Sequence, residues 1–95
     1  MIDELMKRLS ELPDVEEAPS QWNARPAFWI DGREFVHFQT DDEIEVRLTR
    51  KLINELDDAR VTRRTRTSDW VVVGIGESDL VVDLAKRALD ANRRG

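Results

Sequence analysis

The stretch that decides the fold is Trp29-Ile-Asp-Gly-Arg-Glu-Phe-Val-His37, in which two apolar runs flank the dipeptide Asp31-Gly32. Aspartate followed by glycine tolerates a positive φ angle at both central positions of a turn, which a two-residue hairpin turn requires. The pattern therefore predicts a β-hairpin whose arms are residues 27–30 and 33–39.

A two-residue turn also sets the pairing of the arms, and it predicts that Phe28 lies opposite Phe35. Because side chains alternate along a strand, we expect His37 on the face of Phe28 and Phe35, and Glu34 on the other face. His37 is the sole histidine, and unperturbed imidazole titrates at about 6.5. We interpret it as a histidine packed in or beside the core. The alternative is a general acid or base assisted by a nearby carboxylate.

Outward from this hairpin, hydrophobic periodicity predicts the other elements. The expected helices cover residues 2–12, 49–59 and 78–92, and the further strands cover 43–48, 61–65 and 70–75. Residues 14–21, which contain Pro19, are interpreted as an extended loop. The order is helix, three-strand meander, short helix, two-strand hairpin and helix. It predicts an α+β fold, with an antiparallel sheet of about five strands and helices packed mainly on one face.

The composition suits a single domain over residues 1–95. The sequence contains no cysteine and one histidine, so neither a disulfide nor a zinc site is expected, and no cofactor is predicted. The absence of cysteine and of a signal-peptide pattern favours the cytoplasm. The longest apolar run, 70–73, is too short to cross a membrane.

The net charge of −5 argues against nucleic-acid binding, because neutralising phosphates requires a surplus of basic residues. Four arginines nevertheless cluster at Arg60, Arg63, Arg64 and Arg66. On a strand, Arg63 points away from Arg64 and Arg66, so the four cannot line one face. Such charges suit a solvated edge strand. The alternative is contact with an anion, a nucleic acid or an acidic partner, for which the arginine fork is suited.

Three tryptophans are present, at Trp22, Trp29 and Trp70. Alternation places Trp29 on the face of Phe38, and Trp22 lies in the loop before it, so the two indoles are candidates to line a shared groove. Packing in the core is the alternative for these aromatic residues, and it is our interpretation of Trp70.

We therefore predict a protein of unknown function that is most simply a small, non-enzymatic domain. Its expected partner is a small-molecule ligand, another protein or a second copy of this chain. The candidate binding residues are Trp22, Trp29, His37, Phe38, Arg63, Arg64 and Arg66. The alternatives are a small enzyme that uses His37, and an anion- or nucleic-acid-binding module formed by residues 60–66.

Four segments of the chain resemble a family of small, uncharacterised domains called the luciferase family or luciferase domain. They are Gly32-Arg-Glu-Phe-Val-His37, Ile44-Glu-Val-Arg-Leu48, Ser68-Asp-Trp-Val71 and the helix from Ser78 to Ala91. The resemblance does not imply light emission, because flavin luciferases are large barrels and these segments show no flavin or luciferin site. Members of the family often have a second histidine two positions after the first, where this chain has Gln39. The order of elements is also similar to that of YjbR-type domains, which are sometimes described as DNA-binding.

Overall fold

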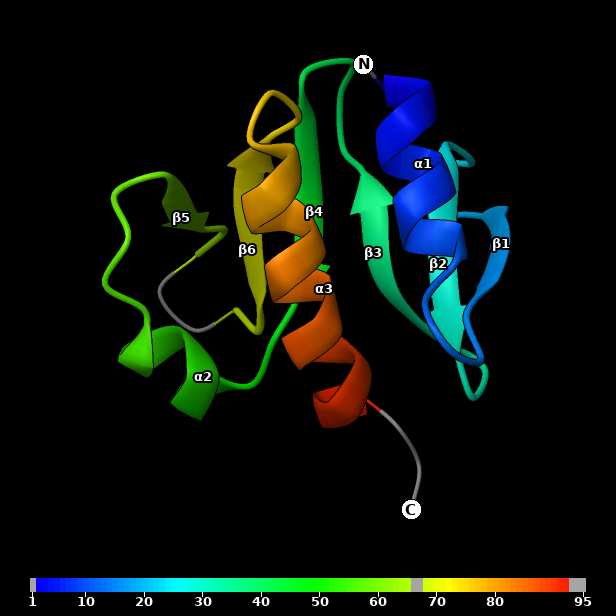
Figure 1. Cartoon of the computed structure of the whole chain (residues 1–95). Coiled ribbons are helices and arrows are strands. Elements are labelled where there is room, and N and C mark those ends of the chain that lie inside the picture. Colours follow the sequence, from blue (N-terminus) through cyan, green and yellow to red (C-terminus); the bar gives the residue numbers. More distant parts are fainter. Residues whose placement is uncertain (1, 66–67, 93–95) are drawn as a thin grey trace.

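The computed structural model describes residues 2–65 and 68–92, and it confirms the predicted α+β class (Figure 1). The described helices are α1 (Ile2–Ser10), α2 (Arg50–Glu55) and α3 (Ser78–Asn92). The described strands are β1 (Glu16–Pro19), β2 (Pro26–Ile30), β3 (Arg33–Phe38), β4 (Glu43–Arg47), β5 (Val61–Arg63) and β6 (Trp70–Gly74). They form one antiparallel sheet in the order β1-β2-β3-β4-β6-β5. In the part of the chain that is described, no helix has the length and apolar character needed to cross a membrane.

The sheet has six strands, one more than the sequence predicted, because the expected loop over residues 14–21 contains β1. This strand lies at the edge of the sheet and pairs only with β2, with Ala18 opposite Ala27. Charged residues and proline are common on edge strands, since they discourage pairing with another chain. The sequence Glu-Glu-Ala-Pro over 16–19 therefore has the composition of a loop and the conformation of an edge strand.

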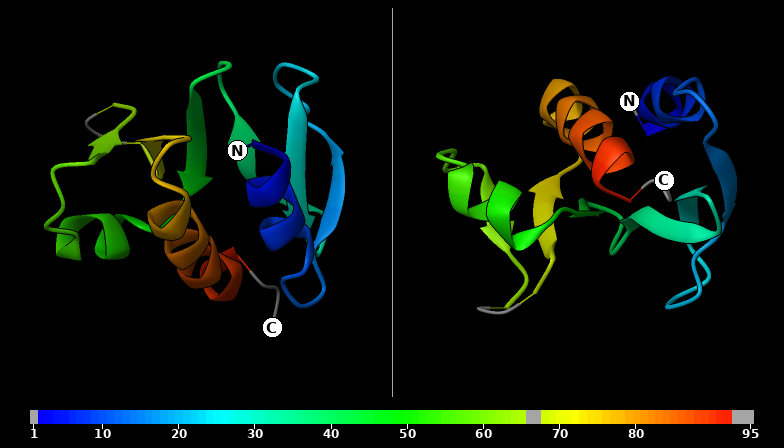
Figure 2. Two further views of the ribbon diagram at one scale, coloured as in Figure 1. Left: turned by 45° about the horizontal axis from the view of Figure 1, so that its top comes forward. Right: turned by 90° about the horizontal axis from the view of Figure 1, so that it is seen from below.

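The helices α1 and α3 cover one face of the sheet, which we call the helical face (Figure 2). Leucines of α1, and leucine, valine and alanine side chains of α3, are buried against apolar residues from β2, β3, β4 and β6. Burial of each large aliphatic side chain contributes about 1.5 to 3 kcal/mol. The short helix α2 lies beside the β5 and β6 end of the sheet and is capped by the Thr49 hydroxyl, which accepts a hydrogen bond from the Leu52 amide at 3.2 Å.

The turn between β2 and β3 has the predicted conformation, with φ values of 52° at Asp31 and 79° at Gly32. The predicted pairing of Phe28 with Phe35 is wrong, because Phe28 lies opposite Val36. A β-bulge between Phe28 and Trp29 shifts the register and leaves Phe35 as an extra residue of β3. The turn sets only the pairs next to it, so it could not reveal a bulge farther along the hairpin.

The bulge changes which side chains of β3 share a face. Phe35 and Val36 both belong to the hydrophobic core. Glu34 and His37, which regular alternation would place on opposite faces, are hydrogen-bonded to each other instead. The prediction that His37 packs beside Phe28 and Phe35 and away from Glu34 is therefore wrong, because one inserted residue reverses the alternation between positions 34 and 37.

We predict that Gly32→Val destabilises the fold by about 1 to 2 kcal/mol, because a β-branched residue is strained at positive φ. Gly76→Ala is the matched control. Gly76 has no positive φ, and a Cβ built on it meets no atom within 4 Å, so its replacement should change stability by less than about 0.5 kcal/mol. Urea unfolding of both variants measures the difference, and equal midpoints would contradict the role assigned to the turn.

Candidate functional site

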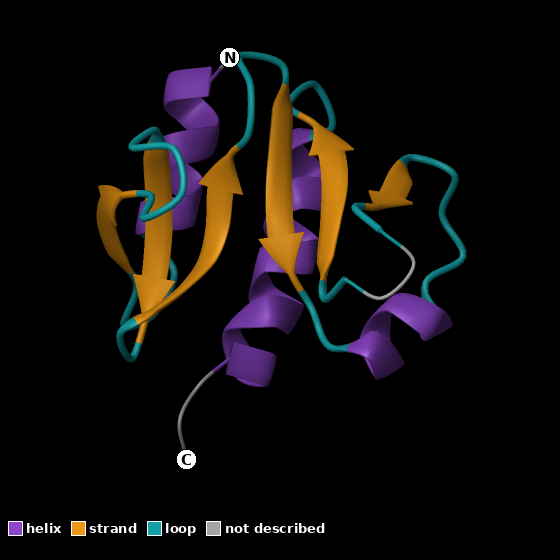
Figure 3. Cartoon of the chain, turned by 180° about the vertical axis from the view of Figure 1, so that it is seen from behind, coloured by secondary structure: helices purple, strands orange, loops and turns teal. Residues whose placement is uncertain are grey.

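The face of the sheet opposite α1 and α3 carries the candidate site, and we call it the open face (Figure 3). The register places four residues in a row across β3, β4, β6 and β5. Each is the direct neighbour of the next, in the order His37, Glu45, Val72, Thr62. The residues flanking His37 in β3 pair with Ile44 and Val46 of the core, so His37 and Glu45 point away from the helices.

His37 lies between two carboxylates. Its Nδ1 atom is 2.7 Å from Oε2 of Glu34, and its Nε2 atom is 2.7 Å from Oε1 of Glu45. The side chains of His37 and Glu34 have no exposed surface, and that of Glu45 is 2% exposed. The carboxylate partner that the enzyme hypothesis requires is thus present twice, but neither ring nitrogen is left to contact a substrate.

The loop between β1 and β2, residues 20–25, folds over the open face (Figure 3), and two of its residues bind the buried carboxylate of Glu34. The Ser20 hydroxyl donates to Oε2 of Glu34 at 2.7 Å, and the Gln21 amide donates to Oε1 at 2.8 Å. The Asn23 side chain fastens the same loop to a backbone carbonyl at the end of β3, at 2.9 Å. The hydrogen bonds from Ser20 and Gln21 replace those that the Glu34 carboxylate would form with water, and they offset the cost of burying its charge.

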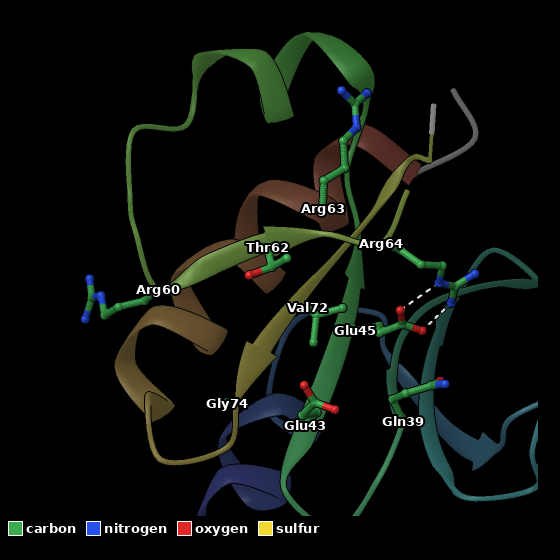
Figure 4. A pocket seen from close by; sticks show the side chains of 9 residues that line it. All are labelled: Gln39, Glu43, Glu45, Arg60, Thr62, Arg63, Arg64, Val72 and Gly74. Carbon is green, nitrogen blue, oxygen red and sulfur yellow. Dashed lines mark hydrogen bonds and ion pairs between the residues drawn. The ribbon is translucent and has the colours of Figure 1, made fainter. Parts of the chain in front are cut away.

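Arg64 holds Glu45 at the other end of the network (Figure 4). Its Nε atom donates to Oε2 of Glu45 at 2.6 Å, and its Nη2 atom donates to Oε1. Its guanidinium carbon lies 5.2 Å from the centre of the Trp70 ring, a cation–π distance, and the His37 ring lies 4.6 Å from the same indole. Burial acts to raise the pKa of Glu45, but hydrogen bonds from Arg64 and His37 outweigh it and lower that pKa below its ordinary value.

With an imidazolium at His37, the four ionisable side chains would balance one another in charge. An imidazolium carries a hydrogen on each ring nitrogen, so it donates to both carboxylates at once. Together with Arg64, the network then contains two positive and two negative charges. A neutral His37 would need a proton on one of the two carboxyl groups to keep both bonds.

A pocket of about 400 Å³ adjoins this network on the open face (Figure 4). It is lined by Gln39, Glu43, Glu45, Arg60, Thr62, Arg63, Arg64, Val72 and Gly74. Figure 4 shows the side chains of Arg60 and Arg63 pointing away from it. Arg60 forms ion pairs with Asp58 and Glu77, and Arg63 donates to the Ser68 carbonyl at 3.0 Å. The predicted separation of Arg63 from Arg64 is therefore confirmed, and Arg66 lies outside the described residues.

The predicted placement of Trp29 and Phe38 on one face is wrong. Phe38 is 2% exposed and pairs with Ile44 in the core of the helical face. Trp29 pairs with Glu34 on the open face, so the bulge separates the two rings that alternation had grouped. Trp29 is partly buried, and its Nε1 atom has no hydrogen-bond partner among the described residues. Trp22, in the loop between β1 and β2, is 67% exposed.

Sequence reasoning did not identify Glu45 as a partner of His37. One signal in the sequence could have found it. A turn over residues 40–42 places Gln39 opposite Glu43. Two residues farther from the turn on each strand, His37 then lies opposite Glu45, and this is the observed pair. Arg64 gave no such signal, because its approach to Glu45 depends on β6 lying between β4 and β5.

We predict that His37→Leu destabilises the fold by about 3 kcal/mol, because it leaves two buried carboxylates without their shared donor. The triple variant Glu34→Leu, His37→Leu, Glu45→Leu removes both charges together with their partner. It should recover most of the lost stability, since apolar replacement of a whole buried ion network is often neutral or stabilising. Urea unfolding tests both variants, and a triple variant less stable than the single one would contradict this account.

We also predict an acid-sensitive contribution from Glu45. Its pKa is lowered in the folded state, so its carboxylate stabilises the protein fully above the ordinary value of 4.5, and this contribution is lost as the pH falls through the lowered pKa. Glu45→Gln should flatten the dependence of the unfolding midpoint on pH between neutral and strongly acidic solution. Glu11→Gln, at an exposed position, is the control. An unchanged slope in Glu45→Gln would refute the prediction.

Comparison with known proteins agrees with the resemblance seen in the sequence. A family model described as Luciferase domain matches residues 32–88, from the hairpin turn into α3, and this span includes Glu34, His37, Glu45 and Arg64. No curated protein and no solved structure matches the chain significantly. Since the family model covers more than half of the 95 residues, the chain belongs to the Luciferase domain family.

Proposed function

We propose that this chain is a small ligand-binding domain, and that Arg64 binds an anionic group of the ligand in the pocket on the open face. The proposal rests on the contacts and the exposure of the Arg64 guanidinium. Glu45 and Trp70 hold it in place, yet 38% of its side chain is exposed. Within the described residues, no acceptor lies in hydrogen-bond reach of its Nη1 atom. A positioned guanidinium with a free edge binds carboxylates and phosphates at little entropic cost.

The buried part of the network supports this role. His37 and Arg64 both bind the carboxylate of Glu45, so Arg64 is held in place without being the sole partner of that carboxylate. A buried ion network is seldom a better source of stability than apolar side chains of the same volume. Its presence on the open face, directly beside a pocket, is therefore better explained by the positioning of Arg64 than by stability alone.

The same geometry favours binding over catalysis. His37 has no exposed surface and both of its ring nitrogens are hydrogen-bonded, so it does not reach the pocket. Glu45 does line the pocket, but its lowered pKa makes it a weak proton acceptor. We further propose that the protein acts in the cytoplasm, since a chain without cysteine suits a reducing compartment. We propose that residues 1–95 form one domain.

The exposed indole of Trp22 supports a second candidate function, contact with a protein partner or a second copy of this chain. Tryptophan is enriched among the residues that dominate protein interfaces. Among the described residues, Trp22 is the large hydrophobic residue that is exposed to solvent, with a relative exposure of 67%. Analytical ultracentrifugation over a wide concentration range tests the homodimer, and it should show association that Trp22→Ser abolishes. A monomer at every concentration would reject that form of the candidate.

The ligand-binding proposal predicts that butyrate, used as a simple carboxylate probe, shifts backbone amide NMR signals around Glu45, Thr62, Arg64 and Val72. Arg64→Gln should weaken this binding at least tenfold, because a hydrogen bond to a charged group contributes about 1.5 to 3 kcal/mol. Arg87→Gln is the matched control, since Arg87 is exposed on α3 and pairs with Asp83. Shifts that are absent, scattered or unchanged in Arg64→Gln would overturn the proposal.

A further inference from the structure

Resting on the proposed binding function, the geometry points to a zwitterionic ligand, whose carboxylate binds Arg64 and whose ammonium group binds Glu43. Both residues line the pocket, and Figure 4 shows Glu43 farther along β4 than Glu45, which lies beside Val72 and binds Arg64. The pocket thus has a positive group at one place and a negative group at another. A ligand with one charge of each sign satisfies both.

The two glutamates of β4 that line the pocket differ in what they bind. Glu43 and Glu45 are two residues apart, so they point to the same face and are separated by about 7 Å along the strand. Glu45 is buried and neutralised by His37 and Arg64. Glu43 is exposed, and no described residue forms a hydrogen bond or an ion pair with its carboxylate. Its negative charge is therefore available to a ligand.

Gly74 leaves space beside Glu43. It is the direct cross-strand partner of Glu43 in β6, so a side chain at position 74 would point into the same part of the pocket. A Cβ built on Gly74 meets no atom within 4 Å, and its φ angle is not in the positive region. Neither backbone strain nor packing in the fold therefore requires glycine here. The missing side chain instead leaves room for an ammonium group at Glu43.

The remaining lining suits the part of a ligand that joins its two charges. Val72 and Thr62 are direct neighbours in the row across the sheet, and they offer methyl groups and one hydroxyl to a short methylene chain. A ligand with two negative charges would be repelled by Glu43, and a simple cation would be repelled by Arg64. A short amino acid avoids both penalties.

The test compares amino acids with carboxylates of the same chain length. Isothermal titration calorimetry would measure 4-aminobutyrate beside butyrate, and 6-aminohexanoate beside hexanoate. We expect at least one amino acid to bind about fivefold more tightly than its matched carboxylate, which corresponds to the upper value of about 1 kcal/mol for an exposed ion pair. Glu43→Gln should remove this preference and leave the affinity for the carboxylates unchanged or higher. Glu11→Gln, at an exposed position on α1's C-terminal side, should leave the preference intact.

Gly74→Val gives an independent arm, because it fills the space beside Glu43 without straining the fold. It should abolish the preference for the amino acid while circular dichroism and the unfolding midpoint stay close to those of the parent protein. Carboxylates that bind at Arg64 as tightly as their amino acids would reject the zwitterion and leave the proposed function standing. A pocket that binds none of the four probes would reject both. A preference that survives in Glu43→Gln would reject Glu43 as the ammonium site.

Discussion

His37 holds a carboxylate at each of its ring nitrogens, and the organisation of the open face depends on this pair of contacts. One bond reaches Glu34 within β3 and the other reaches Glu45 on β4, so a single imidazole joins two strands and the loop that binds Glu34. Burying three ionisable groups is expensive unless each remaining lone pair and hydrogen has a partner. Ser20, Gln21 and Arg64 supply those partners.

The two faces of the sheet are stabilised by different interactions. The helical face is closed by α1 and α3 and is held by apolar burial. The open face has no such cover among the described elements, and its centre is protected by a hydrogen-bonded network in place of a packed helix. The network fixes a guanidinium at the surface, because Arg64 is bound to the buried carboxylate of Glu45 and lies over Trp70. Arg64 therefore has two roles, because it completes the network and also lines the pocket in which we propose that the ligand binds.

Much of the fold follows from local patterns. Asp31-Gly32 adopts the positive φ angles that its sequence predicts, and the alternation over 43–48 places Ile44 and Val46 in the core. Both depend on interactions within a few residues, which a sequence displays directly. Arg63 and Arg64 point in different directions, as the sequence predicts, although β5 ends at Arg63. By contrast, β1 was missed because an edge strand has one pairing partner and tolerates the composition of a loop.

The sequence by itself determined the types of the elements other than β1, the hairpin turn and the identity of the sole imidazole. Only the tertiary structure decided what that imidazole contacts. The bulge in β3 brings Phe35 and Val36 together into the core and so turns Glu34 toward His37. Arg64 reaches Glu45 because β6 inserts between β4 and β5. The bulge breaks the regular alternation from which side-chain facing is deduced, and the contact of Arg64 depends on a strand order that differs from the order in the chain, so a local sequence pattern displays neither.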